Sequence, residues 1–409
     1  MYWRLAFAHT WNQNLEEGDR TPGPSKHLQF CQRKQLHAAT HFLHKEIPTI
    51  FSFFSGAGFL DLGFETCGYE IVYVNEIHKP FLEAYKYARQ KMGIEAPKYG
   101  YFNTDIQSLL KGEEAENLTN LVACTKKGGR LVGFIGGPPC PDFSVGGKNR
   151  GRNGENGKLS KTYVDLICEQ KPDFFIFENV KGLWRTTRHR HFFEELKQQL
   201  HEAGYQCVER LINAVEYGAP QDRERIILFG IKASNKPDMT KFNWSSYAVY
   251  SMDDITDYSW PATDSPSMSR NKPNNILPEL TIQYWFDQND VENHPNSTHQ
   301  FKPRAGLAKF ETVHEGDDSK KSYKRLHRWR YSPTAAYGNN EVHIHPYLPR
   351  RISVAEALAI QSLPKSFELP PTMTLSNMFK AVGNGVPYLA ARGLAQTVLD
   401  FLKISVLNI

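Results

Sequence analysis

The segment TIFSFFSGAGFLDLGFET at residues 49–66, followed by EIVYVNE at residues 70–76, has the pattern of a strand, a loop, a helix and a second strand. The mostly apolar run 49–54 predicts a buried strand, and apolar residues at helical spacing predict a helix over 59–67. A second apolar run predicts another strand over 70–74. Strands joined by a helix in this way are typical of parallel sheets in α/β proteins.

The same alternation continues along the chain. Short apolar runs predict strands over 131–135, 173–177, 205–211 and 225–231, and helical spacing predicts helices over 78–91, 159–170 and 190–203. We therefore expect an α/β fold with a doubly wound parallel sheet that has helices on both faces.

The alternation stops between residues 232 and 349, which are rich in Asn, Ser, Asp, Pro and Tyr. Helical patterns return over 352–361 and again near Ser376. The sequence thus predicts a main domain over 47–231, a second, smaller and irregular domain over 232–349, and a C-terminal segment over 350–409. Residues 1–46 form an N-terminal extension to which the sequence assigns no role.

Composition and charge exclude several classes of protein. The 409 residues are 40% hydrophobic and 23% charged, enough apolar material for a sizeable core. No apolar run approaches the roughly 18 residues of a membrane-spanning helix, and the first residues lack the features of a secretory signal. The six cysteines form no C-x-x-C pair, which argues against zinc and against a disulfide framework. We expect a cytoplasmic protein with no metal site.

Polar or glycine-rich stretches follow four of the predicted strands. They are the loop 55–58, Asn75-Glu76, the loop 136–140 and Glu178-Asn179. The carboxyl ends of parallel strands meet at one edge of a doubly wound sheet, where ligands bind. Polar residues that merely end strands would account for any one stretch, but less well for all four.

The loop 55–58 differs from the dinucleotide pattern G-x-G-x-x-G. Asp61 occupies the position of the third glycine, which favours a nucleoside ligand without a pyrophosphate. Glu76, which ends the second strand, is placed to accept hydrogen bonds from ribose hydroxyls. An ordinary tight turn and a solvated glutamate are the alternatives.

Cys140 lies in GGPPCP (136–141), where three prolines and two glycines hold the thiol in a stiff loop. A thiol presented in this way indicates a nucleophile, although a lone cysteine is more often a small buried residue. The stretch 144–158 that follows has five glycines and the basic residues Lys148, Arg150, Arg152 and Lys158. It has the composition of a flap that closes over a polyanion, or of a simple surface loop.

Glu178 follows an apolar run, and burial there raises the pKa of a carboxyl so that it can donate a proton near neutral pH. Arg223 and Arg225 precede the strand 225–231 with a spacing that places both side chains on one face. Two guanidinium groups can orient a carboxylate and a substrate oxygen, or simply take part in surface ion pairs.

Taken in order, these residues resemble the cytosine-C5 DNA methyltransferase family. The matching motifs are FSFFSGAG (51–58), NE (75–76), DI (105–106), GPPCPDFS (137–144), ENV (178–180), QDRER (221–225), RRISVAEALAIQ (350–361) and GNGVP (383–387). The resemblance covers about 47–231 and 350–400. It implies a Rossmann-like methyltransferase sheet beside which the segment after Gly383 packs.

The resemblance implies a mechanism. Cys140 would attack C6 of a cytosine flipped out of double-stranded DNA. Glu178 would hold N3 and the amine and supply a proton, and Arg223 and Arg225 would hold the base and Glu178. The electron-rich C5 would then take the methyl group of S-adenosylmethionine. The expected cofactor-binding residues are Phe53, Ser55, Gly56, Gly58, Glu76, Asp105, Ile106, Pro139, Asn384 and Gly385.

Residues 232–349 occupy the place of the family's target-recognition domain. Within 319–330, basic residues alternate with Tyr323, His327 and Trp329, a pattern suited to DNA phosphates and base edges. The candidate DNA-binding residues are Lys148, Arg150, Arg152, Lys324, Arg325, Arg328 and Arg330. Pro141 replaces the family's usual Gln after the nucleophile, and Gly385 replaces its usual Ala.

Other functions remain open from the sequence. A tRNA cytosine methyltransferase needs no 118-residue base-reading segment, and a catalytically silent DNA-binding regulator needs no nucleophile. A Rossmann-fold oxidoreductase is disfavoured by Asp61 and by the Pro-Pro-Cys loop. The resemblance further implies a monomer that protects DNA from a partner restriction endonuclease.

Overall fold

The computed structural model describes residues 47–139, 155–264, 271–303, 307–320, 322–334, 337 and 343–407. The chain divides into two units, residues 1–46 and residues 47–409, and every described residue belongs to the second. The predicted N-terminal extension, Cys140, Pro141 and the basic residues Lys148, Arg150 and Arg152 lie outside the described residues.

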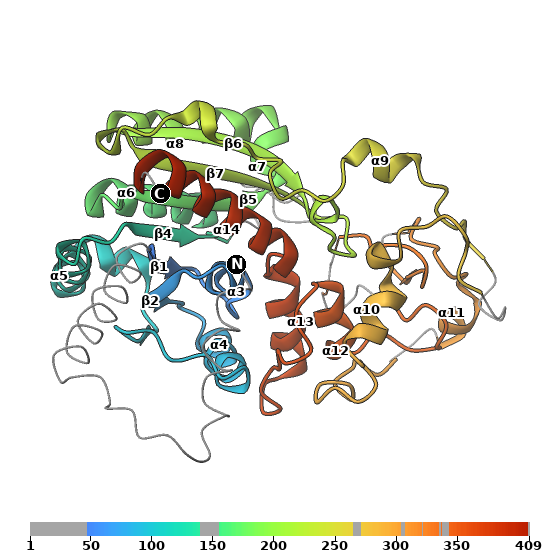
Figure 1. The fold of residues 1–409 in the computed structure, drawn as a ribbon. Helices are drawn as coiled ribbons and strands as arrows, with labels where there is room; N and C mark the ends of the chain where they lie inside the picture. Colours follow the sequence, from blue (N-terminus) through green and yellow to red (C-terminus); the bar gives the residue numbers. More distant parts are fainter. Residues whose placement is uncertain are drawn as a thin grey trace, which may run out of the picture. The chain divides into compact units, whose positions relative to one another are not determined.

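A seven-stranded sheet forms the centre of this unit (Figure 1). The strands are β1 (Thr49–Phe53), β2 (Glu70–Asn75), β3 (Tyr101–Phe102), β4 (Val132–Gly136), β5 (Phe174–Val180), β6 (Tyr205–Asn213) and β7 (Glu224–Lys232). Their order in the sheet is β3-β2-β1-β4-β5-β7-β6. The predicted α/β fold is confirmed, and each predicted strand is present within a few residues of its expected bounds.

The sheet is mixed rather than wholly parallel. Strands β1 to β5 pair in parallel, but β7 runs antiparallel to both β5 and β6. The prediction of a parallel sheet is therefore wrong for β7. The connection 214–223 between β6 and β7 is too short for the crossover that parallel pairing needs. As a result, the first residues of β7 lie at the edge where β1 to β5 end, and Arg225 pairs with Val180 of β5.

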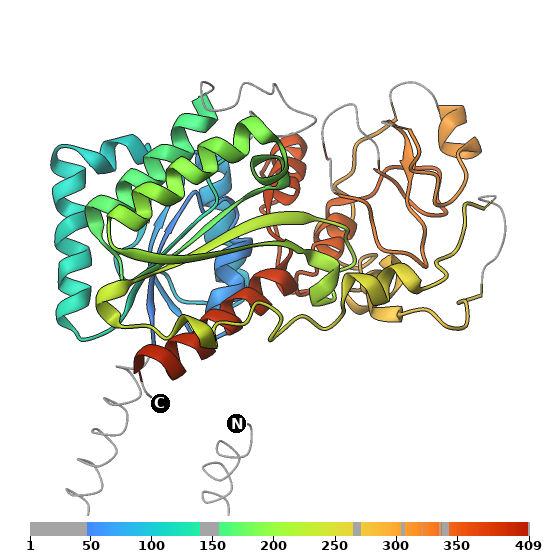
Figure 2. The same cartoon turned by 90° about the horizontal axis from the view of Figure 1, so that it is seen from above.

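Helices cover both faces of the sheet (Figures 1 and 2). On one face, α3 (Phe59–Thr66), α4 (Lys79–Lys91) and α14 (Tyr388–Leu402) pack on strand residues such as Ile50 and Ile176. On the other, α5 (Glu113–Lys127), α6 (Glu155–Gln170) and α8 (Thr187–Glu202) pack on residues such as Phe51 and Phe177. Of these helices, α3, α4, α6 and α8 match the predicted ones, whereas α5 and α14 were not predicted.

The region 232–349 consists of short elements, as predicted. They are α9 (Met252–Asp257), α10 (Ile282–Gln288), α11 (Leu307–Thr312), β8 (Lys324–Arg325) and β9 (His343–Ile344). Its longest helix among the described residues is α10, with seven residues. The helices α12 (Val354–Ile360) and α13 (Leu375–Asn384) pack with α10 and with α3 and α4 in one apolar cluster.

No helix among the described residues has the length and apolar character that a membrane-spanning helix needs. Helix α7 (Lys181–Arg185) follows β5 directly and brings the chain to α8.

Candidate active site

The loop after β1 and the end of β2 are held together by Glu76. The Glu76 carboxylate accepts hydrogen bonds from the backbone N–H of Gly56 (2.8 Å) and of His78 (2.7 Å). Burial raises the pKa of Glu76, while these two N–H donors and the Lys380 ammonium act to lower it. The structure thus brings Glu76, the residue predicted to bind a ribose, into direct contact with the predicted glycine loop.

Phe53 and Phe54 have different environments at the end of β1. Phe53, predicted as a cofactor residue, is 1% exposed and packs on Phe134 in the core of the sheet, with ring centroids 4.8 Å apart. Phe54 is half-buried, with a φ of 51° that bulky residues rarely adopt. The prediction is therefore corrected: the alternation of the strand points Phe53 inward, and Phe54 is the ring available at the loop.

Asp105 follows the short strand β3, beside the end of β2. Its carboxylate accepts a hydrogen bond from the N–H of Gln107 (3.0 Å) and caps a short 3-10 helix, while the residue itself is exposed. Ile106 is 3% exposed and packs in the core, so its predicted contact with the cofactor stays a prediction. The neighbouring Asn103 side chain donates to the carbonyls of Glu76 and Ile77, both at 2.8 Å.

Glu178 and Arg225 form an ion pair at the centre of the edge, with Arg225 Nε 2.9 Å from Glu178 Oε1. Glu178 lies within β5 rather than after it, and it is 8% exposed. Burial raises the pKa of Glu178, and the positive charges of Arg225 and Arg223 oppose that rise. Burial therefore favours the neutral carboxyl, whereas the two arginines favour the ionised carboxylate.

The loop that leads to Cys140 passes directly over this carboxyl. A Cβ atom on Gly137 would lie 2.6 Å from Glu178 Oε2, so any larger residue there would displace the carboxylate. The side-chain amide of Asn179 donates to the carbonyl of Pro138 (3.4 Å), and Pro139 is exposed. Cys140 itself lies outside the described residues, but the chain is beside Glu178 three residues before it.

Arg223 joins β7 to α13 instead of binding Glu178. Its guanidinium donates to the carbonyl of Gly383 (2.8 Å), and the residue is 1% exposed. Burial and the adjacent Arg225 lower the pKa of Arg223. Of the two arginines predicted to hold Glu178, therefore, Arg225 makes the contact, and Arg223 ties the returning C-terminal segment to the site.

Helix α13 carries the remaining predicted cofactor residues. Asn384 ends this helix and is exposed, and Gly385 caps it and packs against the ring of Phe59 in α3. Lys380 lies one helical turn before Asn384 on the same face and is close enough to Glu76 and His78 to lower their pKa values. Sequence reasoning missed Lys380, whose position at i−4 from Asn384 was the available signal.

Two of the predicted DNA-binding arginines, Arg325 and Arg328, have partners within the region 232–349, and Arg325 is buried. Arg325 is 1% exposed and donates to the carbonyls of Val313 (2.7 Å), His345 (2.8 Å), Leu348 (3.1 Å) and Phe310. Since its guanidinium is surrounded by carbonyl oxygens, Arg325 holds segments of the chain together rather than presenting charge to DNA.

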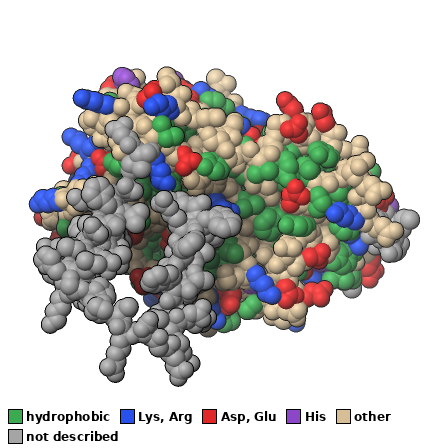
Figure 3. All heavy atoms as spheres, in the orientation of Figure 1, with side chains coloured by type: hydrophobic (Ala, Val, Ile, Leu, Met, Phe, Trp, Pro, Cys, Tyr) green, Lys and Arg blue, Asp and Glu red, His purple; other side chains and the backbone are tan. Residues whose placement is uncertain are grey.

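Arg328 also has a partner inside the protein. It pairs with the buried carboxylate of Glu315 through two contacts of 2.9 Å and 3.0 Å. Lys324 and Arg330 remain partly exposed. On the face shown in Figure 3, the Lys and Arg side chains drawn in colour are scattered among Asp and Glu rather than gathered in one patch.

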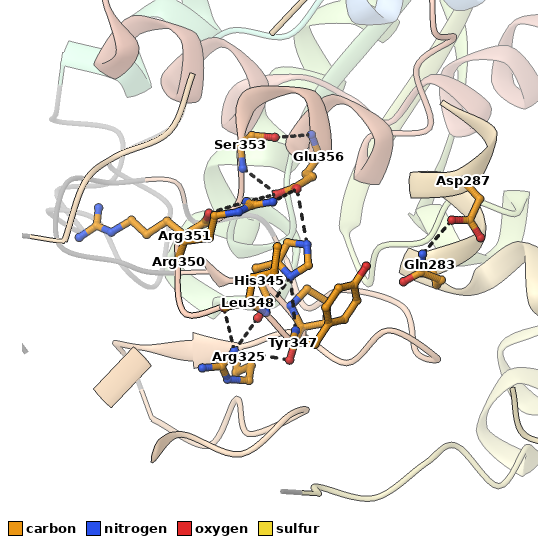
Figure 4. A network of polar contacts seen from close by, with 11 residues as sticks. Gln283, Asp287, Arg325, His345, Tyr347, Leu348, Arg350, Arg351, Ser353 and Glu356 are labelled. Carbon is orange, nitrogen blue, oxygen red and sulfur yellow. Dashed lines mark hydrogen bonds and ion pairs between the residues drawn. The ribbon is translucent and has the colours of Figure 1, made fainter. Parts of the chain in front are cut away.

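Polar contacts of the motif 350–361, which contains α12, join that helix to the region 232–349 (Figure 4). Arg350 binds both oxygens of the Glu356 carboxylate, at 2.9 Å and 2.6 Å, and Glu356 forms a capping box with Ser353 at the start of α12. The ring of His345 lies 3.5 Å from the same carboxylate and accepts the N–H of Leu348. Burial and Arg350 lower the pKa of His345, so this histidine is neutral.

Comparison with known proteins now decides the family. Residues 49–400 match the family described as C-5 cytosine-specific DNA methylase. The chain belongs to this family. As a member, it is a DNA cytosine-5 methyltransferase, which confirms the resemblance seen in the sequence.

Individual relatives agree with this assignment. The chain is 64% identical to the type II methyltransferase M.NmeDI of Neisseria meningitidis, over 87% of this chain and 84% of that protein. It is 29% identical to M.FnuDI of Fusobacterium nucleatum, over 87% and 96%. A prophage-encoded DNA modification methyltransferase from E. coli shares the fold, with a TM-score of 0.61, 21% identity and coverage of 87% and 99%.

Proposed function

We propose that this methyltransferase transfers a methyl group from S-adenosylmethionine to C5 of a cytosine flipped out of a specific site in double-stranded DNA. We further propose that the modification protects that site from a cognate restriction endonuclease, as the type II name of the 64% identical relative supports. The enzyme would act as a monomer in the cytoplasm, where both DNA and a reduced thiol at Cys140 are available.

The residues at the ends of β1 and β2 fit S-adenosylmethionine. Glu76 presents a carboxylate, the hydroxyl of Ser55 is buried without a hydrogen-bond partner, and the apolar residue Ile77 is 59% exposed. A cationic nucleoside without phosphates suits such a site because it offers hydroxyls, a flat base and positive charge. When bound, S-adenosylmethionine supplies an electrophilic methyl group. Glu76 would accept its ribose hydroxyls, and Asp105 and Asn384 would line the same site.

The chain's own residues would act on the cytosine in sequence. The Cys140 thiolate forms a bond to C6, while the Glu178 carboxyl gives its proton to N3, so that C5 becomes nucleophilic. After C5 is methylated, it gives its proton to a water molecule, the N3 proton returns to Glu178, and the bond from C6 to sulfur breaks as the thiolate leaves. Arg225 keeps Glu178 in place throughout, because its ion pair fixes the carboxyl against the base.

The target cytosine must leave the base stack, since C6 is shielded inside a duplex. The basic stretch with Lys148, Arg150 and Arg152 would close behind the flipped base and contact phosphates. In the region 232–349, Lys324 and Arg330 are the remaining candidates for DNA contact.

The observation that supports this mechanism most is the buried Glu178–Arg225 pair beside Gly137, three residues before Cys140 in the sequence. The test is to incubate the purified chain with labelled S-adenosylmethionine and genomic DNA, and then to map 5-methylcytosine by bisulfite sequencing. We expect methylation of one short sequence, and plasmids carrying that mark should resist a restriction enzyme that cuts it. Incorporation of label into adenine or into N4 of cytosine would contradict the mechanism.

The same assay decides between DNA and tRNA as substrate. In parallel reactions, tRNA replaces DNA at equal nucleotide concentration. Label in DNA alone is expected, whereas label in tRNA alone would make the chain an RNA methyltransferase. Binding of DNA with no transfer to either substrate would indicate a silent DNA-binding regulator.

A further inference from the structure

A buried ionic cluster lies between α3 and α4, beneath the loop 55–58. We call this loop, which is proposed to bind the cofactor, the cofactor loop. Asp61 and Glu65 come from α3, and Tyr85 and Arg89 come from α4. Asp61 and Arg89 are each 1% exposed, so the cluster is shielded from water. Removing such charges from water costs free energy, and apolar residues of similar size would often stabilise a core at least as well.

Arg89 makes contacts with both helices and with the loop. Its Nε lies 2.7 Å from Glu65 Oε2, its guanidinium lies over the Tyr85 ring at 4.3 Å, and its Nη2 donates to the carbonyl of Gly58 (2.6 Å). Burial raises the pKa of Glu65 to about 7 in spite of this contact. The guanidinium is therefore the group in the cluster that reaches the loop backbone.

Gly58 is shaped to receive this contact. It has a φ of 80° and begins α3, and a Cβ there would lie 2.5 Å from the Tyr85 ring and 2.9 Å from Arg89 Nη2. The loop backbone thus rests directly on Tyr85 and Arg89. The N–H of Gly58 donates to the carbonyl of Ser55 (2.9 Å), and this hydrogen bond closes the turn. The turn places the N–H of Gly56 2.8 Å from the Glu76 carboxylate.

We propose that Arg89 is a positioning residue for the cofactor, because its hydrogen bond to Gly58 sets the turn that presents Ser55, Gly56 and Glu76. The inference rests on the proposed use of S-adenosylmethionine. A continuous series of contacts supports it: Arg89 to the Gly58 carbonyl, Gly58 to Ser55, and Gly56 to the Glu76 carboxylate.

Arg130 provides a matched control at the opposite end of β1. Its Nε donates to the carbonyl of Ile47 (2.9 Å), just before β1, and it pairs with Glu70 at the start of β2. Arg130 therefore makes the same kinds of contact, to a backbone carbonyl and to a glutamate, but away from the cofactor loop. Because the Arg130 side chain is 18% exposed and that of Arg89 is 1% exposed, Arg89→Met should lose more stability, and urea unfolding measures that difference separately from ligand affinity.

The experiment compares wild type, Arg89→Lys, Arg89→Met and Arg130→Met in the full chain. Calorimetry measures the affinity for S-adenosylhomocysteine, urea unfolding measures stability, and hydrogen exchange measures protection of residues 54–58. We expect at least a tenfold loss of affinity and faster exchange in Arg89→Met, a smaller loss in Arg89→Lys, and unchanged affinity in Arg130→Met. The KM for S-adenosylmethionine should rise in the Arg89 variants, with kcat little changed.

The two possible failures are distinguishable. If wild type binds the ligand and both Arg89 variants bind equally well, Arg89 has no positioning role. If wild type does not bind S-adenosylhomocysteine at all, the proposed cofactor is wrong and the inference is overturned with it. Should Arg89→Met not fold, Arg89→Lys keeps the charge and decides the question alone.

Discussion

Glu178 is subject to two opposing influences that together suit it to proton transfer. Burial in β5 favours its neutral form, and the guanidinium of Arg225 at 2.9 Å favours its ionised form. A carboxyl balanced in this way can donate a proton to a ring nitrogen and take it back in the next step. Glu178 on the sheet edge and Arg225 on an antiparallel strand must both be in place for this.

We predict that Arg225→Met shifts the basic limb of the kcat–pH profile to higher pH. The limb falls where Glu178 loses the proton that it must donate, and removal of a nearby positive charge raises that pKa. Arg225→Lys keeps the charge and should shift the limb less. Steady-state rates between pH 5.5 and 9.5 test this, and a shift to lower pH would show that Glu178 does not act as the acid.

We predict that Cys140→Ser abolishes methyl transfer while specific DNA binding stays within a fewfold of wild type. A serine hydroxyl is far less ionised than a thiol at neutral pH and so does not attack C6. Incorporation of labelled methyl groups and gel-shift titration measure the two properties separately. Turnover at the wild-type rate would show that Cys140 is not the nucleophile.

We predict that Glu76→Ala weakens binding of S-adenosylhomocysteine by on the order of 100-fold. Two hydrogen bonds from ribose hydroxyls to a carboxylate would be lost, each worth about 1.5 kcal/mol. Glu83→Ala, on the exposed side of α4, is the control and should bind normally. Equal affinity of Glu76→Ala and wild type in calorimetry would exclude the ribose role.

The sequence identifies a site residue when the residue lies next to a strong local pattern. Glu76 and Glu178 adjoin apolar runs, so their place at the sheet edge could be predicted. Arg89 contacts the glycine loop from α4, and no local pattern links it to Gly58. Lys380 lies near Glu76 from α13, and its i−4 spacing from Asn384 was the signal that sequence reasoning missed. The apolar run 49–54 could not show that Phe53 lies in the core while Phe54, with its positive φ, is half-buried just beyond the end of β1.

At the level of elements, charge in the region 232–349 often serves packing. A basic run such as 319–330 looks the same in sequence whether its arginines face solvent or the interior. In this region, short helices and two-residue strands leave many backbone carbonyls without partners from regular secondary structure. Arg325 satisfies several of them from inside, a role that becomes visible only when 310–313 and 345–348 are seen around it.

We predict that Arg325→Met lowers the free energy of unfolding by on the order of 3 kcal/mol, because buried carbonyls lose their donor. The exposed Lys320→Met serves as the control and should change stability by less than about 0.5 kcal/mol. Urea unfolding gives the stability, and limited proteolysis locates the loosened segment, which we expect within 307–350. Wild-type stability with weakened DNA binding would instead favour a direct phosphate contact.

At the level of the whole molecule, the antiparallel β7 determines how the site is assembled. Because its first residues lie where β1 to β5 end, Arg223 and Arg225 join Glu76 and Glu178 at one edge. Arg223 then binds Gly383, which brings α13 and Asn384 to that edge from 160 residues away. The alternation of strand-like and helix-like runs predicts the α/β class. The direction of β7 depends on the short connection 214–223, which becomes informative only once β6 and β7 are known to pair with each other.

A DNA surface at this edge must draw its charge from separate segments, because the net charge of +5 is small and Arg325 and Arg328 have partners inside the protein. On the proposed function, we expect the basic stretch after Cys140 to make a large share of the phosphate contacts. We predict that Arg150→Gln reduces the slope of log K against log salt concentration by about 1, since each phosphate contact releases about one counterion. Lys127 is exposed and lies before β4, at the opposite edge, so Lys127→Gln should leave the slope unchanged. Fluorescence anisotropy at salt concentrations from about 50 to about 300 mM measures both slopes. If the two variants behave alike, the stretch after Cys140 does not contact phosphate, and the charge that holds DNA must come from the region 232–349.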